Sequence, residues 1–104
     1  SLHCLTPDTA IAALDGNSDA LVIDVREPGE AADSKARGSI NIPRGVLEMK
    51  ITNYTTDPNQ PIYLYCATGG RAALAASALE AMGFTSVSLI DCSCDELISH
   101  MGED

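Results

Sequence analysis

Apolar and polar residues are arranged along this chain in a pattern that predicts short buried strands separated by helices. Three short apolar runs, ALVIDV at 20–25, IYLYC at 62–66 and SVSLI at 86–90, contain the β-branched and aromatic residues typical of buried strands. GSINIP at 38–43 alternates apolar with polar residues and ends in proline, which predicts one more brief strand.

Helices are predicted between these strands. Thr6, Pro7 and Asp8 provide a capping hydroxyl, a proline for the first helical position and an acid for the first turn, and this helix should run to Leu14. Further segments are expected at 28–33 (a short turn or helix), at 46–51, at 72–82 and at 95–101.

The alternation of strands and helices implies an α/β fold, with a small parallel sheet covered by helices on both faces. A length of 104 residues, 45% of them hydrophobic, is enough for one core, so residues 1–104 are expected to form a single domain. In such sheets ligands bind beyond the carboxyl ends of the strands, and Cys66 lies at one of those ends.

The net charge of the chain argues against some classes of binding partner. Fifteen acidic and six basic residues give a net charge of −9, which argues against nucleic acid and anionic membrane surfaces as partners. No apolar run approaches the roughly 18 residues that a membrane-spanning helix needs. The chain starts at Ser1 without a recognisable leader, so a cytoplasmic location is expected, or a periplasmic one if a leader has been removed.

The four cysteines, at 4, 66, 92 and 94, do not suggest a disulfide framework or a metal site. Small disulfide scaffolds are usually shorter and less apolar. Cys92 and Cys94, separated by one residue and with His100 nearby, fit the ligand spacing of a zinc site poorly. Cys4 is expected to be incidental.

The segment from Cys66 to Arg71 joins a predicted strand to a predicted helix. A helix N-terminus stabilises a thiolate, and consecutive N–H groups in a glycine-containing loop can form an anion-binding nest. Arg71 would add a permanent cation. A buried cysteine and a solvent-facing arginine are the simpler interpretation, but the glycine pair between them favours a cradle for an anion or a thiolate. The small residues of this loop are Ala67, Thr68, Gly69 and Gly70.

CATGGR at 66–71 resembles the six-residue active-site loop of rhodanese-like sulfurtransferases, which has the pattern C-x-x-G-x-R. LVIDVREPGE at 21–30 resembles the first signature of that family, and GSINIP resembles its G-A-I-N-I-P segment. GF-x-x-V at 83–87 is similar to the approach to the family's last strand. The resemblance covers residues 5–100.

The resemblance implies a single rhodanese domain that transfers sulfane sulfur. Cys66 would be the nucleophile that takes sulfur from thiosulfate or a persulfide, and cyanide or a thiol, free or on a protein, would accept it. Residues 67–70 would cradle the Cys66 persulfide, and Arg71 would hold the anionic end of the donor. No metal or organic cofactor is implied, and a monomer is expected, with a dimer as the alternative.

Three alternatives accompany this interpretation. The first is a phosphatase: the active-site loop of related phosphatases resembles C-x5-R, which holds a phosphate and is one residue longer than the C-x4-R of this chain. A sulfur carrier loaded by a protein partner is the main rival, because Ala67 and Thr68 are uncharged and leave a dianionic donor only Arg71 and backbone amides. A regulatory domain without activity is disfavoured, since both Cys66 and Arg71 are retained.

A second group of residues has weaker support. Asp24 and Arg26 match the family's D-V-R segment, and we interpret them as a charge pair closing the first strand, with substrate contact as the alternative. Arg44 could supply positive potential near the site, or be an ordinary surface arginine.

The chain also departs from the family pattern. The histidine of the family's G-H-I-P segment is absent from residues 34–37 (SKAR), so no role of that histidine transfers. Residues 91–94 (DCSC) replace a Gly-Gly pair after the last strand, and the chain has no tryptophan. Cys92 and Cys94 are expected to fill the space of those glycines; the alternative is a resolving thiol for Cys66.

Overall fold

Five parallel strands form one sheet in the computed structural model, which describes residues 3–103. The spatial order is β1-β5-β4-β2-β3, and every neighbouring pair is parallel. The strands are β1 (Cys4–Leu5), β2 (Leu21–Asp24), β3 (Ile40–Asn41), β4 (Ile62–Tyr65) and β5 (Val87–Ile90). The predicted α/β fold with a parallel sheet is therefore confirmed.

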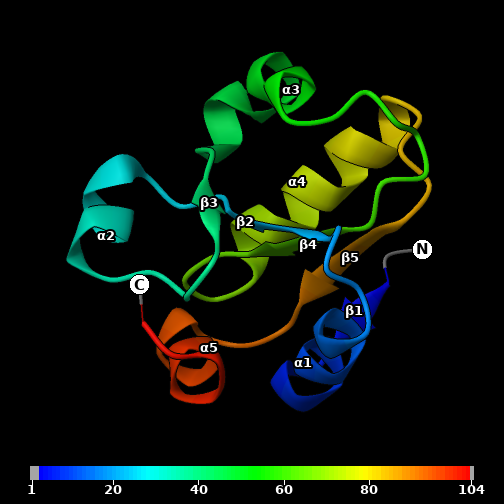
Figure 1. Cartoon of the computed structure of the whole chain (residues 1–104). Helices are drawn as coiled ribbons and strands as arrows, with labels where there is room; N and C mark the ends of the chain where they lie inside the picture. The colour runs from blue at the N-terminus through cyan, green and yellow to red at the C-terminus, as the bar shows by residue number, and fades with distance from the viewer. Residues whose placement is uncertain (1–2, 104) are drawn as a thin grey trace.

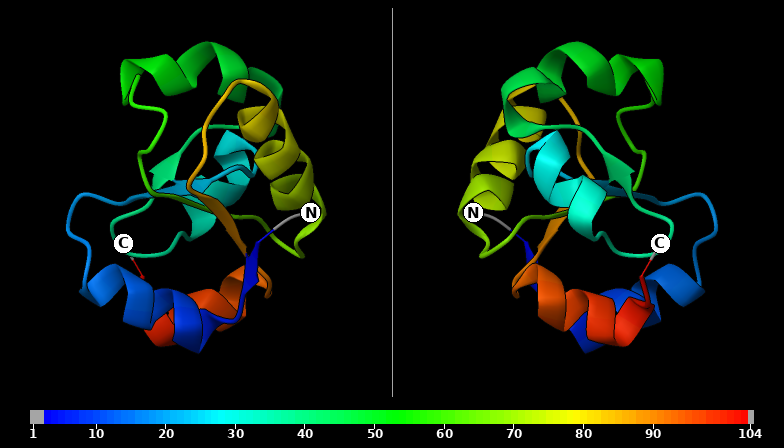
Figure 2. Two further views of the ribbon diagram at one scale, coloured as in Figure 1. Left: turned by 90° about the vertical axis from the view of Figure 1, so that its right-hand side faces the viewer. Right: turned by 90° about the vertical axis from the view of Figure 1, so that its left-hand side faces the viewer.

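Helices cover both faces of the sheet, as Figures 1 and 2 show. α3 and α4 lie on one face and α1 and α5 on the other, while α2 lies beyond the β3 edge (Figure 1). The helices are α1 (Pro7–Asp15), α2 (Pro28–Asp33), α3 (Leu47–Lys50), α4 (Gly70–Ala81) and α5 (Cys94–Met101), with 3-10 turns η1 (Arg44–Val46) and η2 (Ile51–Asn53) on either side of α3.

The sheet separates two groups of buried side chains. Successive residues of a strand point to opposite faces, so Leu64 joins the group under α4 and Tyr65 joins the group under α1 and α5. Cys66, the next residue, belongs to the α4 side again. This alternation decides which surroundings each side chain near the site receives.

Apart from shifts at the ends of other elements, the structure differs from the sequence prediction in three segments. β1 was not predicted, because two residues carry no periodic signal; its pairing of Cys4 with Leu89 exists only once β5 is in place. The helix predicted at 46–51 is a single α turn between two 3-10 turns. α4 begins at Gly70, two residues before the predicted start at 72.

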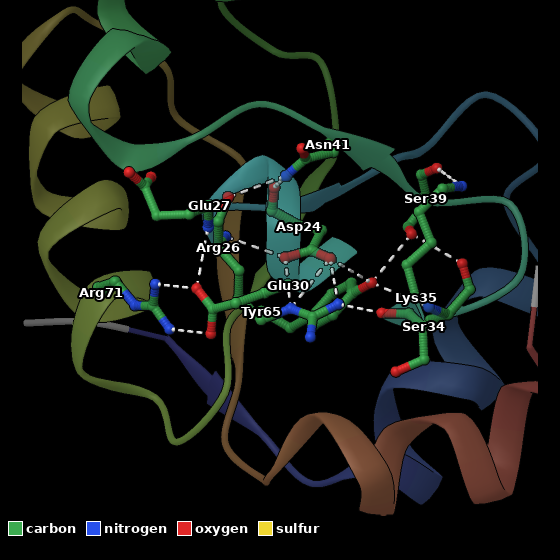
Figure 3. A network of polar contacts seen from close by, with 11 residues as sticks. Asp24, Arg26, Glu27, Glu30, Ser34, Lys35, Ser39, Asn41, Tyr65 and Arg71 are labelled. Atoms are coloured by element: carbon green, nitrogen blue, oxygen red, sulfur yellow. Dashed lines mark hydrogen bonds and ion pairs between the residues drawn. The ribbon is translucent and has the colours of Figure 1, made fainter. Parts of the chain in front are cut away.

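A buried polar network closes the carboxyl ends of β2 and β4 (Figure 3). Asp24 is 0% exposed and forms an ion pair with Arg26, whose Nη2 lies 2.7 Å from Asp24 Oδ2. The Tyr65 hydroxyl donates to the same Oδ2 at 3.1 Å and accepts the N–H of Ala36 at 2.9 Å. This is the charge pair expected at the end of the strand predicted at 20–25, which is β2 in the structure. A tyrosine from the neighbouring strand β4 joins it.

The titratable groups of this network keep the protonation states that its hydrogen bonds require. Hydrogen bonding to Asp24 raises the pKa of Arg26, so the guanidinium remains charged. Burial raises the pKa of Tyr65 to about 12, so its hydroxyl remains a donor at neutral pH. A paired, fully hydrogen-bonded carboxylate is the form in which a buried charge is tolerated.

We expect Tyr65→Phe to lower the free energy of unfolding by about 1–3 kcal/mol, because it leaves the buried Ala36 N–H without its acceptor and removes one of the donors to the buried Asp24 carboxylate. Tyr63→Phe, the same change at a half-buried position on the same strand, is the matched control and should cost less than about 0.5 kcal/mol. Urea unfolding of both variants measures the difference. Equal losses would contradict the role given to the network.

Candidate active site

The carboxyl ends of the parallel strands meet at one edge of the sheet, and Cys66 is the first residue after β4 at that edge. Residues 67–69 turn the chain, and α4 begins at Gly70. The strand–turn–helix predicted for this segment is therefore present as β4, a turn and α4 (Figure 1), and Cys66 is the first residue of the turn.

Backbone N–H groups surround the sulfur of Cys66. The residue is 1% exposed, and its Sγ accepts hydrogen bonds from the N–H groups of Gly69 at 3.0 Å and Ala72 at 3.3 Å. Both bonds stabilise negative charge on the sulfur, as does the N-terminal end of the helix dipole. The N–H groups of Gly70 and Arg71 lie in the first turn, where a helix provides no acceptor, so they are available to a bound anion.

Gly69 makes this turn possible. It has a φ of +102°, a left-handed conformation that favours glycine, and a Cβ on it would lie 3.6 Å from Oδ1 of Asp91. Gly70 has an ordinary helical conformation, and a Cβ there would have no atom within 4 Å. Of the two glycines singled out in the sequence, only Gly69 is required by the backbone conformation.

The sequence suggested that Arg71 is a cation free to bind the donor, but in the structure Arg71 is paired with an acid. Its guanidinium forms two hydrogen bonds with Glu30 of α2, Nη1–Oε1 at 2.6 Å and Nη2–Oε2 at 3.0 Å (Figure 3). The Oε1 of Glu30 also accepts the N–H of Glu27 at 3.0 Å, which holds the carboxylate in place. Arg71 and the Glu27 N–H together lower the pKa of Glu30 to about 2, and Glu30 in turn raises the pKa of Arg71.

The sequence pattern does not identify Glu30 as a site residue. Its spacing from Glu27 is typical of a helix start, where the second acid caps the first turn, and that local signal identifies no distant partner. Arg71 follows 41 residues later, so their contact depends on β2 and β4 lying side by side.

Asp24, Arg26 and Arg44 lie at the carboxyl ends of β2 and β3, and each is paired with an opposite charge. Arg26 is 5% exposed and also donates to the carbonyl of Ser34, so it belongs to the buried network. Arg44 follows β3 at the same edge of the sheet, and its Nη1 lies 2.7 Å from Oε1 of Glu48, one helical turn later. The positive charge expected from Arg44 is thus offset by a neighbouring carboxylate.

Cys92 and Cys94 lie on the other side of the sheet from Cys66. Both thiols belong to the buried group under α1 and α5, whereas Cys66 belongs to the group under α4. Burial raises the pKa of Cys92 to about 11, and it also raises the pKa of Cys94. The N–H of Cys94 donates to the carbonyl of Ala67 at 3.2 Å, so it is the backbone of Cys94 that bonds to the loop. This arrangement favours the space-filling interpretation over a resolving thiol.

Two further observations concern ligands and membranes. In the described part of the chain, no group of three or more His, Cys, Asp or Glu side chains is placed to hold a metal ion. Nor does any helix between residues 3 and 103 have the length and apolar character required to cross a bilayer.

Comparison with known proteins places this geometry in a family. The Rhodanese-like domain family matches residues 6–100. The uncharacterized protein YqhL of Bacillus subtilis is 38% identical over 72 residues, which are 69% of this chain and 56% of that protein. The chain thus spans little more than half the length of that relative.

Solved structures agree on the fold. The polysulfide-sulfur transferase of Wolinella succinogenes, a homodimer, is 31% identical with a TM-score of 0.79, over 94% of this chain and 74% of that one. A protein of unknown function from Rhodopseudomonas palustris, described as a possible tyrosine phosphatase, is 33% identical with a TM-score of 0.78, over 94% and 80%. Since the family match extends over nearly the whole chain and includes the Cys66 loop, the chain belongs to the rhodanese-like domain family.

Proposed function

We propose that this protein is a rhodanese-type sulfurtransferase that moves sulfane sulfur through a persulfide on Cys66. The observation that supports this most directly is the pair of N–H donors on the Cys66 sulfur, at the start of a helix and in a loop of C-x4-R length. Such a site stabilises a thiolate nucleophile and has further amides for a second sulfur atom.

In the first step the Cys66 thiolate attacks the outer sulfur of thiosulfate or of a persulfide. A bond forms between the two sulfur atoms, and the bond between the outer sulfur and the rest of the donor breaks. Its electron pair leaves with the donor, as sulfite in the case of thiosulfate. The negative charge stays on the terminal sulfur of the new persulfide, within reach of the amides of Gly70 and Arg71.

In the second step cyanide or a thiolate, free or on a protein, attacks that terminal sulfur. The bond to the Cys66 sulfur breaks, its electron pair returns to Cys66 as the thiolate, and the acceptor leaves as thiocyanate or as a persulfide. Both steps are balanced without an external oxidant or a metal, and they predict ping-pong kinetics.

A phosphatase is the weaker candidate. One structural relative is described as a possible tyrosine phosphatase, but a phosphate has three outer oxygen atoms to be held around the phosphorus. The loop between Cys66 and Arg71 has four residues, one fewer than C-x5-R, and Arg71 is already bonded to Glu30. Both features favour a smaller and less highly charged group.

A sulfur carrier loaded by a protein partner is the second candidate, and the Arg71–Glu30 pair favours it specifically. Sulfur transfer from thiosulfate, 3-mercaptopyruvate and glutathione persulfide distinguishes the two. Turnover with these small donors would support the enzyme, whereas loading only from a protein persulfide would support the carrier.

We expect Cys66→Ser to reduce sulfur transfer to the level of the reaction without protein, because a serine hydroxyl at neutral pH does not form the persulfide. Cys92→Ser and Cys94→Ser are the controls and should retain transfer, since both thiols lie on the other side of the sheet. Mass spectrometry after incubation with donor should find sulfane sulfur on Cys66 alone. Activity in Cys66→Ser would contradict the nucleophile, and sulfane sulfur on Cys92 or Cys94 would revive the resolving thiol.

We expect Gly69→Ala to slow persulfide formation by about fivefold to thirtyfold, because a left-handed φ costs a non-glycine residue about 1–2 kcal/mol and shifts the N–H that bonds the Cys66 sulfur. Gly70→Ala is the matched change without backbone strain and should have a much smaller effect. The rate of persulfide formation, followed by mass spectrometry, measures both. Equal effects of the two substitutions would show that the left-handed turn does not matter.

A further inference from the structure

The one basic side chain of the Cys66 loop is held by an acid from another part of the chain. Arg71 and Glu30 face each other with both nitrogens of the guanidinium fork bonded to both carboxylate oxygens. Bidentate pairing of this kind has a fixed geometry and uses the edge of the guanidinium that would otherwise bind an oxyanion. Their side chains are 36% and 37% exposed, so the pair lies at the surface of the site and not beneath it.

The other charges at this edge of the sheet do not compensate for that pairing. Arg26 is bonded to Asp24 in the interior, and Arg44 is paired with Glu48. The carboxylate of Asp91 lies close to the turn at Gly69. An incoming donor therefore meets a loop with backbone N–H groups, a neutralised arginine and a further acid nearby.

We propose that Glu30 is a specificity-determining residue for the sulfur donor, which it selects by holding Arg71. It disfavours donors with a dianionic group beside the sulfane sulfur, such as thiosulfate. It favours donors in which that group carries less negative charge. This inference rests on the proposed sulfurtransferase function.

The physical reason is electrostatic. With Glu30 ionised, the net charge of the Glu30–Arg71 pair is zero, so a donor gains little from approaching Arg71 and must compete for its N–H groups. Because the pKa of Glu30 is lowered to about 2, the carboxylate remains charged throughout the pH range of an enzyme assay. The selection is therefore a permanent property of the site, which mild acid does not relieve.

Two donors that differ by one charge can test the selection. Thiosulfate carries two negative charges and releases sulfite, and methanethiosulfonate carries one and releases methanesulfinate. In both cases the Cys66 thiolate attacks the outer sulfur, and the broken sulfur–sulfur bond leaves its electron pair on the departing group. A change in their ratio of rates therefore reports on charge and not on the chemistry of the step.

Glu30→Gln is the informative variant, because a glutamine oxygen can still accept the N–H of Glu27 while the negative charge is lost. We expect the rate constant for Cys66 persulfide formation from thiosulfate, relative to that from methanethiosulfonate, to rise about tenfold. Asp33→Asn removes the same charge from an exposed position at the other end of α2 and should change the ratio less than about twofold. Melting temperatures of both variants are measured alongside.

The outcomes separate the inference from the proposed function. A ratio that does not change in Glu30→Gln, or one that changes equally in Asp33→Asn, overturns the role of Glu30 while Cys66 loading stands. No Cys66 persulfide from any donor, in the unmodified protein or in the variant, overturns the proposed function itself. Ionic strength gives a further test: added salt should bring the thiosulfate ratios of the unmodified protein and of Glu30→Gln closer together, and a difference that salt does not reduce would contradict the electrostatic origin.

Discussion

The buried carboxylate of Asp24 holds together the edge of the sheet on which the candidate active site lies. β2 and β4 pair so that Asp24 lies opposite Tyr65. The Tyr65 hydroxyl and the Arg26 guanidinium both donate hydrogen bonds to the Asp24 carboxylate. A buried charge without these partners would be costly, so the strand ends have one favourable arrangement. Cys66 directly follows Tyr65, and that arrangement determines where the Cys66 sulfur lies.

Next to this buried ion pair, the candidate active site consists mostly of backbone N–H groups. Two N–H groups contact the Cys66 sulfur, and the left-handed conformation of Gly69 brings one of them into position. The charged side chains nearby cancel in pairs, since Arg71 is bonded to Glu30 and Arg44 to Glu48. A loop of this kind stabilises one negative charge on sulfur with oriented amides, and it holds no excess of positive charge to attract a highly anionic donor.

Much of the fold and of the loop could be predicted from the sequence, because those signals are local. Short apolar runs identified β2, β4 and β5, and the order of small residues, glycines and arginine identified the strand–turn–helix at Cys66. Local signals failed where structure depends on distant partners. β1 is too short to have a pattern of its own, and the segment at 44–53 divides into one α turn and two 3-10 turns.

The order of residues along the chain is enough to predict the class of fold, the position of the thiol at a strand end and the C-x4-R length of the loop. These follow from residue order alone, since backbone conformation is governed largely by neighbours in the chain. The charge of the site and the surroundings of the other thiols depend on contacts between segments that are distant in the chain. Glu30 meets Arg71 across 41 residues, and the packing of α5 and of the loop before it puts Cys92 and Cys94 on the face opposite Cys66. Contacts of this kind form because the strands pair side by side, and spacing along the chain does not encode them.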